Sequence, residues 1–110
     1  MPNSKLILKE NPTLKDFQEY VHELEIERSF IDQSVVQKCL LLGEEIGELF
    51  KAVRKAESIS IDKQNSKLTT VEEELADILI YICSIANRYK IDLETAFRKK
   101  EEVNKKRVWS

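Results

Sequence analysis

Residues 70–89, TVEEELADILIYICSIANRY, decide the class of fold. Thr70 followed by Glu73 forms a capping box, a pattern typical of a helix start. Apolar residues then recur at intervals of three and four, which is the period of one face of an α-helix. The stripe consists of Val71, Leu75, Ile78, Leu79, Ile82 and Ala86. We therefore expect a helix that runs from here to about Tyr89.

Three more helices are predicted around this one. The first opens with a capping-box pattern of Thr13 and Asp16. The second begins at a cap provided by Asp32 or Ser34 and runs to about Glu57. The fourth begins at Asp92 and runs to about Lys106. Residues 58–69 are polar and aperiodic, which indicates a loop. The expected organisation is an N-terminal extension over residues 1–12 and one domain over residues 13–110.

Composition favours an all-α fold and excludes several classes of protein. The 110 residues include only 2 glycines and 2 prolines, too few for the turns of a β-sandwich. A net charge of −2 argues against a general nucleic-acid-binding protein. The most apolar stretch, residues 75–86, is too short to cross a bilayer, and the N-terminus does not resemble a signal peptide. We expect a cytoplasmic protein without a membrane partner.

Both cysteines lie within apolar helical pattern, so we expect Cys39 and Cys83 to be reduced and buried. A zinc site is not expected, because the single histidine, His22, is at no suitable spacing from them.

Two pairs of acidic residues border apolar faces. On the second predicted helix, Glu45 and Glu48 lie beside the apolar stripe, whereas Glu44 points toward water. That stripe consists of Leu42, Ile46, Leu49 and Val53. On the third, Glu74 and Asp77 are neighbours at a spacing of three. Asp77 interrupts an apolar context, and a buried carboxylate requires neutralisation.

Two such helices can bring four carboxylates to one point, where they repel each other unless a cation is bound. Oxygen ligands favour Mg²⁺, with Mn²⁺ as a substitute. The alternatives that the residues leave open are that the acids are solvated surface charges, or that Arg54, Arg88 or a lysine pairs with Asp77.

The fourth predicted helix carries Lys100, Asn104 and Arg107 on one face. Two cations and an amide donor suit phosphate oxygens, although a solvated basic face has the same pattern. Gly43 and Gly47 each cost a helix about 1 kcal/mol relative to alanine. We interpret them as the site where another helix, in this chain or a second subunit, approaches closely.

The acidic motifs resemble those of a known superfamily. Glu44-Glu45-x-x-Glu48 and Glu74-x-x-Asp77 are similar to the EExxE and ExxD motifs of the all-α nucleoside triphosphate pyrophosphohydrolases. This superfamily includes MazG, dimeric dUTPase, dCTP pyrophosphatase and phosphoribosyl-ATP pyrophosphohydrolase. The similarity continues through the apolar third helix to the final K-x-x-x-N-x-x-R of residues 100–107.

The resemblance implies a four-helix MazG-like bundle completed by oligomerisation, with a tetramer favoured over a dimer. It implies Mg²⁺-dependent hydrolysis of a nucleoside triphosphate to the monophosphate and pyrophosphate, as in house-cleaning of nucleotide pools. The implied metal ligands are Glu45, Glu48, Glu74 and Asp77, and the implied substrate contacts are Lys100, Asn104, Arg107, Tyr81 and Phe30. Glu48 is also the preferred candidate to orient or deprotonate the attacking water.

One departure bears on the substrate. Members that hydrolyse dCTP carry an aromatic residue near the end of the second helix, but residues 54–57 offer none. A broader substrate range fits equally well. The other hypotheses that remain are a non-catalytic helical interaction module and a phosphoribosyl-ATP pyrophosphohydrolase.

Overall fold

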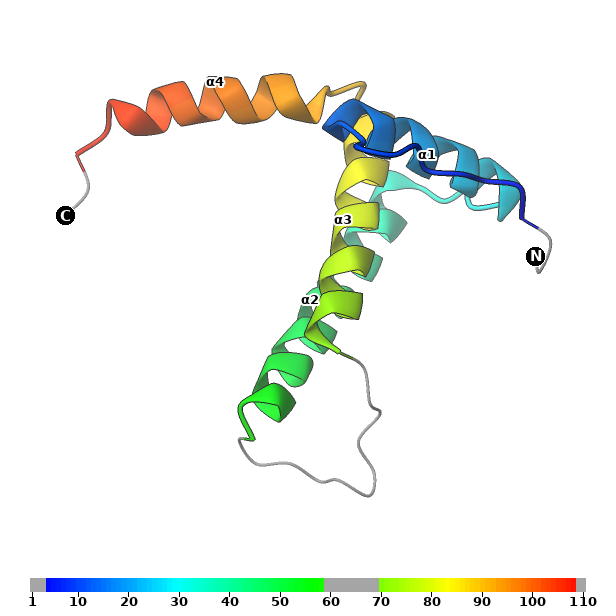
Figure 1. Cartoon of the computed structure of the whole chain (residues 1–110), viewed down its shortest axis with the longest axis horizontal. Coiled ribbons are helices and arrows are strands. Elements are labelled where there is room, and N and C mark those ends of the chain that lie inside the picture. The colour runs from blue at the N-terminus through cyan, green and yellow to red at the C-terminus, as the bar shows by residue number, and fades with distance from the viewer. Residues whose placement is uncertain (1–3, 59–69, 109–110) are drawn as a thin grey trace. The chain divides into compact units, whose positions relative to one another are not determined.

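The computed structural model describes residues 4–58 and 70–108, and they form four α-helices (Figure 1). The helices are α1 (Leu14–Glu27), α2 (Val35–Ala56), α3 (Val71–Arg88) and α4 (Leu93–Lys105). The described chain has no strand, which confirms the all-α prediction. The predicted loop over 58–69 lies outside the described residues except for Ser58.

Side-chain caps fix where the helices begin. Thr13 and Asp16 form a reciprocal capping box, with the Asp16 amide 3.2 Å from the Thr13 hydroxyl. At α2, Ser34 and Gln37 form a second one, so that Ser34 rather than Asp32 is the cap. The Thr70 hydroxyl accepts from the amide of Glu73, and the Asp92 carboxylate from that of Thr95. The helix starts were therefore readable from sequence.

The chain divides into two compact units. Residues 33–82 form one unit, which holds α2 and most of α3. Residues 1–32 and 83–110 form the other, which holds α1, the end of α3 and α4. No described helix is long and apolar enough to span a membrane.

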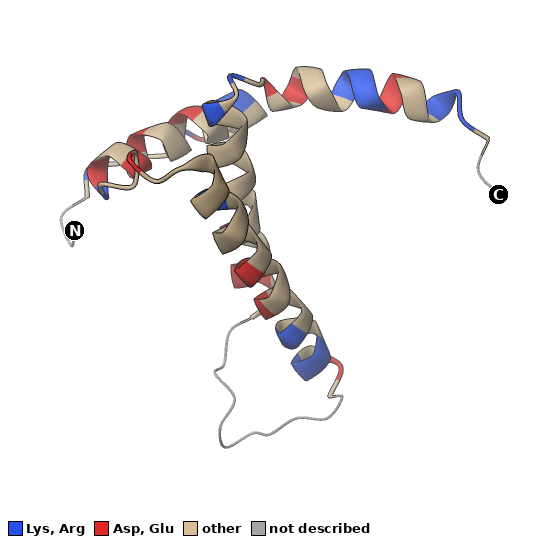
Figure 2. Cartoon of the chain, turned by 180° about the vertical axis from the view of Figure 1, so that it is seen from behind, with Lys and Arg blue, Asp and Glu red and all other residues tan. Residues whose placement is uncertain are grey.

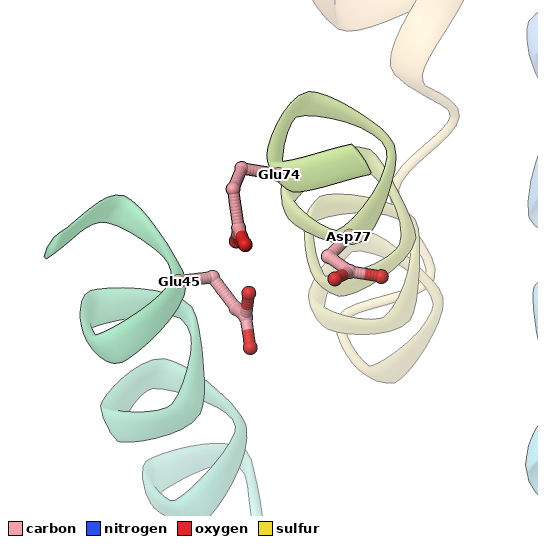
Figure 3. A group of neighbouring side chains, drawn as sticks. All are labelled: Glu45, Glu74 and Asp77. Atoms are coloured by element: carbon pink, nitrogen blue, oxygen red, sulfur yellow. The ribbon is translucent and has the colours of Figure 1, made fainter. Parts of the chain in front are cut away.

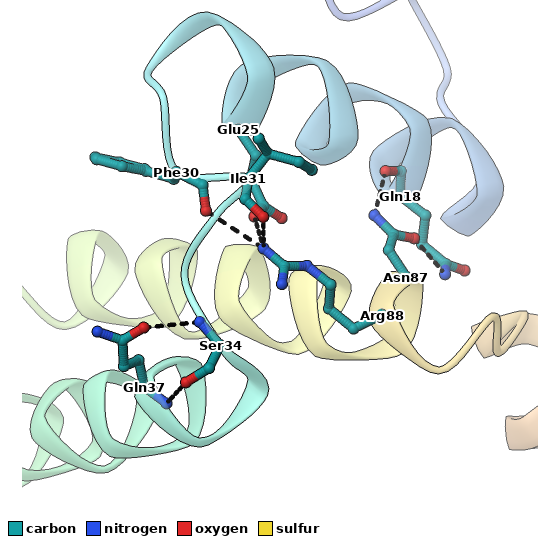
Figure 4. A network of polar contacts seen from close by, with 8 residues as sticks. All are labelled: Gln18, Glu25, Phe30, Ile31, Ser34, Gln37, Asn87 and Arg88. Carbon is teal, nitrogen blue, oxygen red and sulfur yellow. Dashed lines mark hydrogen bonds and ion pairs between the residues drawn. The ribbon is translucent and has the colours of Figure 1, made fainter.

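In the unit that contains α1, a buried amide ties α1 to the turn between α3 and α4. The Gln18 side-chain amide donates to Asn87 Oδ1 at 3.1 Å and to the Ile91 carbonyl at 2.8 Å. Its oxygen accepts from the Leu93 amide at 2.9 Å, and Asn87 Nδ2 donates to the Gln18 carbonyl. The turn is closed by Lys90 at a φ of 56°. Both polar atoms of the Gln18 side chain are thus bonded, and Figure 4 shows the contacts between Gln18 and Asn87.

A buried ion pair joins the same elements. Arg88 donates to Glu25, which is almost fully buried, at 3.1 Å, and to the carbonyls of Phe30 and Ile31 at 3.3 and 2.9 Å (Figure 4). Arg88 thereby fixes the chain that follows α1. Of the partners expected for Asp77, Arg88 is therefore bonded elsewhere.

In the unit that contains α2, few residues of this helix are buried. Its buried α2 residues are Lys38 and Ala52, which lie two turns either side of Glu45 on one face. Ile46 and Val53 of the predicted apolar stripe are exposed, and so is Leu75 on α3. These apolar residues are exposed in this chain by itself, because the side of α2 that carries Lys38, Glu45 and Ala52 turns toward α3.

The prediction for the cysteines was half correct. Cys83 is fully buried and its thiol is free, with a pKa raised by burial. Cys39 is exposed, because it lies on the outward side of α2 with the apolar residues that this chain leaves uncovered.

Candidate metal and nucleotide site

Three carboxylates from α2 and α3 converge in the unit formed by residues 33–82. One oxygen each of Glu45, Glu74 and Asp77 lies within 4.8 Å of the other two. Figure 3 shows Glu45 reaching from α2 toward Glu74 and Asp77, which project from adjacent turns of α3. The spacing of three between the α3 acids places both on the side that faces α2.

Glu74 is the buried member of this group. Its residue is 3% exposed, and its Oε2 has no hydrogen-bond partner within the described structure. Asp77, which we expected to be the buried acid, is exposed, because it lies nearer the rim of the α2–α3 face. A buried carboxylate oxygen without a donor is costly, and a cation is one means of satisfying it.

Glu45 and Asp77 are hard to ionise because of burial and of the neighbouring acidic residues of α2 and α3, which are red in Figure 2. Burial, a hydrogen bond with Glu74 and the charges of Asp77, Glu74 and Glu48 raise the pKa of Glu45 from 4.5 to about 7. Burial and the charges of Glu74 and Glu73 likewise raise the pKa of Asp77. A bound cation would reverse this repulsion, so the three residues fit a hard metal ion with oxygen ligands.

Glu48 lies outside this group of three. It is half-buried on the next turn of α2, and its charge reaches Glu45 on one side and Lys55 on the other. Its role as a fourth ligand or as the residue that positions water stays a prediction. Glu44 is exposed, as expected.

Tyr81 lies four residues after Asp77 on α3 and is half-buried. Burial and then the charges of Glu45, Asp77 and Glu44 raise the pKa of its hydroxyl, which places the ring beside the acidic group. The ammonium of Lys38 lies 5.9 Å from the centre of this ring. Sequence reasoning missed Lys38, although a lysine in the apolar run VVQKCLLL, two turns before Glu45, was a visible signal.

The remaining predicted substrate contacts belong to the other unit. Phe30 follows α1 with an exposed ring, and its carbonyl accepts from Arg88. On α4, Lys100 and Arg107 are exposed and Asn104 is half-buried. Their contact with a nucleotide at the acidic group stays a prediction.

Both glycines of α2 face open space. No described atom outside the local helix backbone lies within 4 Å of a Cβ built on Gly43 or Gly47. Within the unit of residues 33–82, the described residues thus supply no closely approaching helix at these glycines, and the approach of a second subunit stays a prediction.

Comparison with known proteins agrees with the acidic motifs. The family model of the MazG nucleotide pyrophosphohydrolase domain matches residues 33–108. The chain is 33% identical to dCTP pyrophosphatase 1 of rat and 31% identical to that of human. Each alignment covers 100 residues, 87% of this chain. The chain spans 59% of the length of these curated relatives.

Solved structures give the same answer. Two crystal structures of iMazG from Vibrio DAT 722 are 29% identical to this chain and match it with TM-scores of 0.59 and 0.58. Each match covers 86% of this chain, and it covers 99% and 95% of the respective iMazG chains. The chain belongs to the MazG nucleotide pyrophosphohydrolase domain family.

Proposed function

We propose that this protein hydrolyses nucleoside or deoxynucleoside triphosphates to the monophosphate and pyrophosphate in a Mg²⁺-dependent reaction. The observation that carries the proposal is the convergence of Glu45, Glu74 and Asp77, with a buried Glu74 oxygen that lacks a partner. Membership of the MazG family supports a nucleotide as the substrate.

The chain's own residues supply the ligands and the orientation. Glu45, Glu74 and Asp77 hold the metal, with Glu48 as the expected fourth ligand. Bound there, Mg²⁺ or Mn²⁺ would supply positive charge against the triphosphate and would acidify water. Glu48 orients or deprotonates the attacking water, while Lys100, Asn104 and Arg107 meet phosphate or sugar oxygens. Tyr81 and Phe30 are the residues that we expect to contact the base.

The base preference is broader than cytosine in this proposal. Both curated relatives are named dCTP pyrophosphatase 1. Residues 54–57 at the end of α2 nevertheless contain no aromatic side chain that could close over the base. A house-cleaning role in the cytoplasm, acting on several nucleotides, accords with this difference and with the free thiol of Cys83.

The test is pyrophosphate release from all ribo- and deoxyribonucleoside triphosphates, with Mg²⁺ and with EDTA. We expect metal-dependent release from more than one base. Release from none of them by a folded sample would overturn the proposal. Hydrolysis of phosphoribosyl-ATP in the same assay would then identify that alternative, and a melting temperature indifferent to Mg²⁺ would favour a non-catalytic interaction module.

The active form is proposed to be a homo-oligomer, a tetramer in preference to a dimer. The outward face of α2 carries Leu40 and Phe50, which are 67% and 69% exposed, with Gly43 and Gly47 between them. An apolar face of this kind is unfavourable in water. We propose that a second copy of this chain covers the face, because two such helices can cross closely at their glycines. In a symmetric dimer contact, the same face of each copy is buried against the other.

A further inference from the structure

Lys38 is a charged side chain that the proposed reaction leaves unused. It lies on the inward face of α2 and is 2% exposed, the only lysine or arginine of the described residues that is buried. Burying an ammonium costs free energy, and a methionine or leucine would fill the same space without that cost. The charge at this position therefore calls for an explanation.

Lys38 lies at a different level of α2 from Glu45. Lys38 precedes Glu45 by seven residues, which separates them by about 10 Å along the axis of α2. The Lys38 ammonium lies over the Tyr81 ring, 5.9 Å from the ring centre. This is within the range at which a cation is attracted to the face of an aromatic ring.

Tyr81 links this contact to the acidic group. It follows Glu74 by seven residues and Asp77 by four, so all three lie on the same side of α3. Lys38 with Tyr81 and Glu45 with Glu74 are thus successive levels between α2 and α3. A nucleotide held by its phosphates at the acidic level would extend its nucleoside part along these helices.

We propose that Lys38 is a positioning residue for the nucleotide base: it holds the Tyr81 ring in the orientation in which that ring contacts the purine or pyrimidine. This inference rests on the proposed function and adds a residue to it. The attraction between the ammonium and the ring limits the rotation of a half-exposed side chain. Lys38 itself touches neither the phosphates nor the metal.

The test compares Lys38→Met with Lys38→Arg. Methionine keeps the packing of the stem and removes the charge, whereas arginine keeps a cation over the ring. We expect Lys38→Met to raise the KM for the best nucleotide about 3- to 30-fold. The kcat and the inhibition constant of inorganic pyrophosphate, which has no base, should change by less than about twofold. Lys38→Arg should restore most of the KM, and Lys51→Met on the same helix is the matched control.

A double-mutant cycle separates positioning from general packing. Adding Lys38→Met to Tyr81→Leu should raise the KM no further, because the ring through which Lys38 acts is absent. The contact itself has a readout independent of turnover: the ε-methylene proton signals of Lys38 should be shifted upfield by the Tyr81 ring and return in Tyr81→Leu. Circular dichroism and melting temperature confirm that each variant folds.

The outcomes distinguish this inference from the proposed function. A wild-type protein that is inactive on every nucleotide refutes the proposed function, whatever the proton signals show. If the wild type is active, any of three results for Lys38→Met refutes the positioning role. The substitution leaves the KM unchanged, weakens the binding of pyrophosphate and nucleotide equally, or adds its full effect on the KM to that of Tyr81→Leu.

Discussion

The three carboxylates of the acidic group, Glu74, Glu45 and Asp77, differ in how far each is buried. Glu74 is almost completely enclosed, Glu45 is half-buried and Asp77 is exposed. The buried carboxylate acts on both neighbours, since its charge contributes to the raised pKa of Glu45 and of Asp77. Such a group gains more from a divalent cation than three solvated acids would.

Removing one ligand charge should disable the site without unfolding the protein. We expect Asp77→Asn to lower kcat/KM for nucleotide by about 100-fold or more, because the exposed amide replaces a charged metal ligand. Glu44→Gln, on the same acidic segment but pointing outward, is the matched control and should retain activity. Wild-type rates in Asp77→Asn, with helicity confirmed by circular dichroism, would remove Asp77 from the ligand set.

The raised pKa of Glu45 predicts a pH dependence of stability. A carboxyl group with a higher pKa in the folded protein than in the unfolded one stabilises the fold below its unfolded pKa, and this contribution is lost as the pH rises through the folded value. For Glu45 that window runs from 4.5 to about 7. The free energy of unfolding in EDTA should therefore fall across this range.

Urea unfolding in EDTA at about pH 5 and about pH 7.5 measures the effect. Glu45→Gln cannot ionise and should show a smaller fall than the wild type. Mg²⁺, which favours the ionised carboxylates, should oppose the fall at the higher pH. Identical pH profiles for the wild type and Glu45→Gln would contradict the coupling described here.

At the scale of the helices, start positions were predictable because they depend on local chemistry. Thr13, Ser34 and Asp92 bond to amides three residues ahead, a pattern that is visible in sequence. The orientation of α2 and α3 was not predictable in this way. Helical periodicity shows which residues share a face, but it does not show which face of α2 packs against α3.

The contacts of Gln18, Glu25 and Arg88 were also missed. They join residues at least 57 positions apart, and no local pattern marks them. In contrast, the acidic residues could be identified because their spacing of three within each helix is local. Sequence reasoning did not establish that Glu74 is the buried acid, since burial depends on how the two helices face each other.

The ion pair between Arg88 and Glu25 should hold α1 to the end of α3. Arg88→Met leaves the buried Glu25 carboxylate without its cationic donor and should cost about 2 to 4 kcal/mol of unfolding free energy. Combining it with Glu25→Leu should recover much of this loss, because no buried charge then remains. Denaturant unfolding of the single and double variants measures the coupling, and additive losses would show that the pair does not act as a unit.

At the scale of the whole molecule, the apolar outward face of α2 predicts self-association. Phe50→Asp places a charge on that face and should shift the protein to a smaller species in light scattering after size exclusion, with a lower melting temperature. Lys51→Glu is the control on the same turn. A wild-type protein that is monomeric at micromolar concentration, or an unchanged assembly in Phe50→Asp, would refute this interface.

The central claim is that the α2–α3 carboxylates hold the metal on which nucleotide hydrolysis depends. The most direct measurement is the initial rate of pyrophosphate release as a function of Mg²⁺ concentration, for the wild type and for Glu74→Gln. We predict a wild-type rate that rises with Mg²⁺ concentration and vanishes in EDTA. The rate of the variant should be lower by a factor of at least about 100 at every Mg²⁺ concentration. Release that persists in EDTA, or equal rates for the two proteins, would contradict the account.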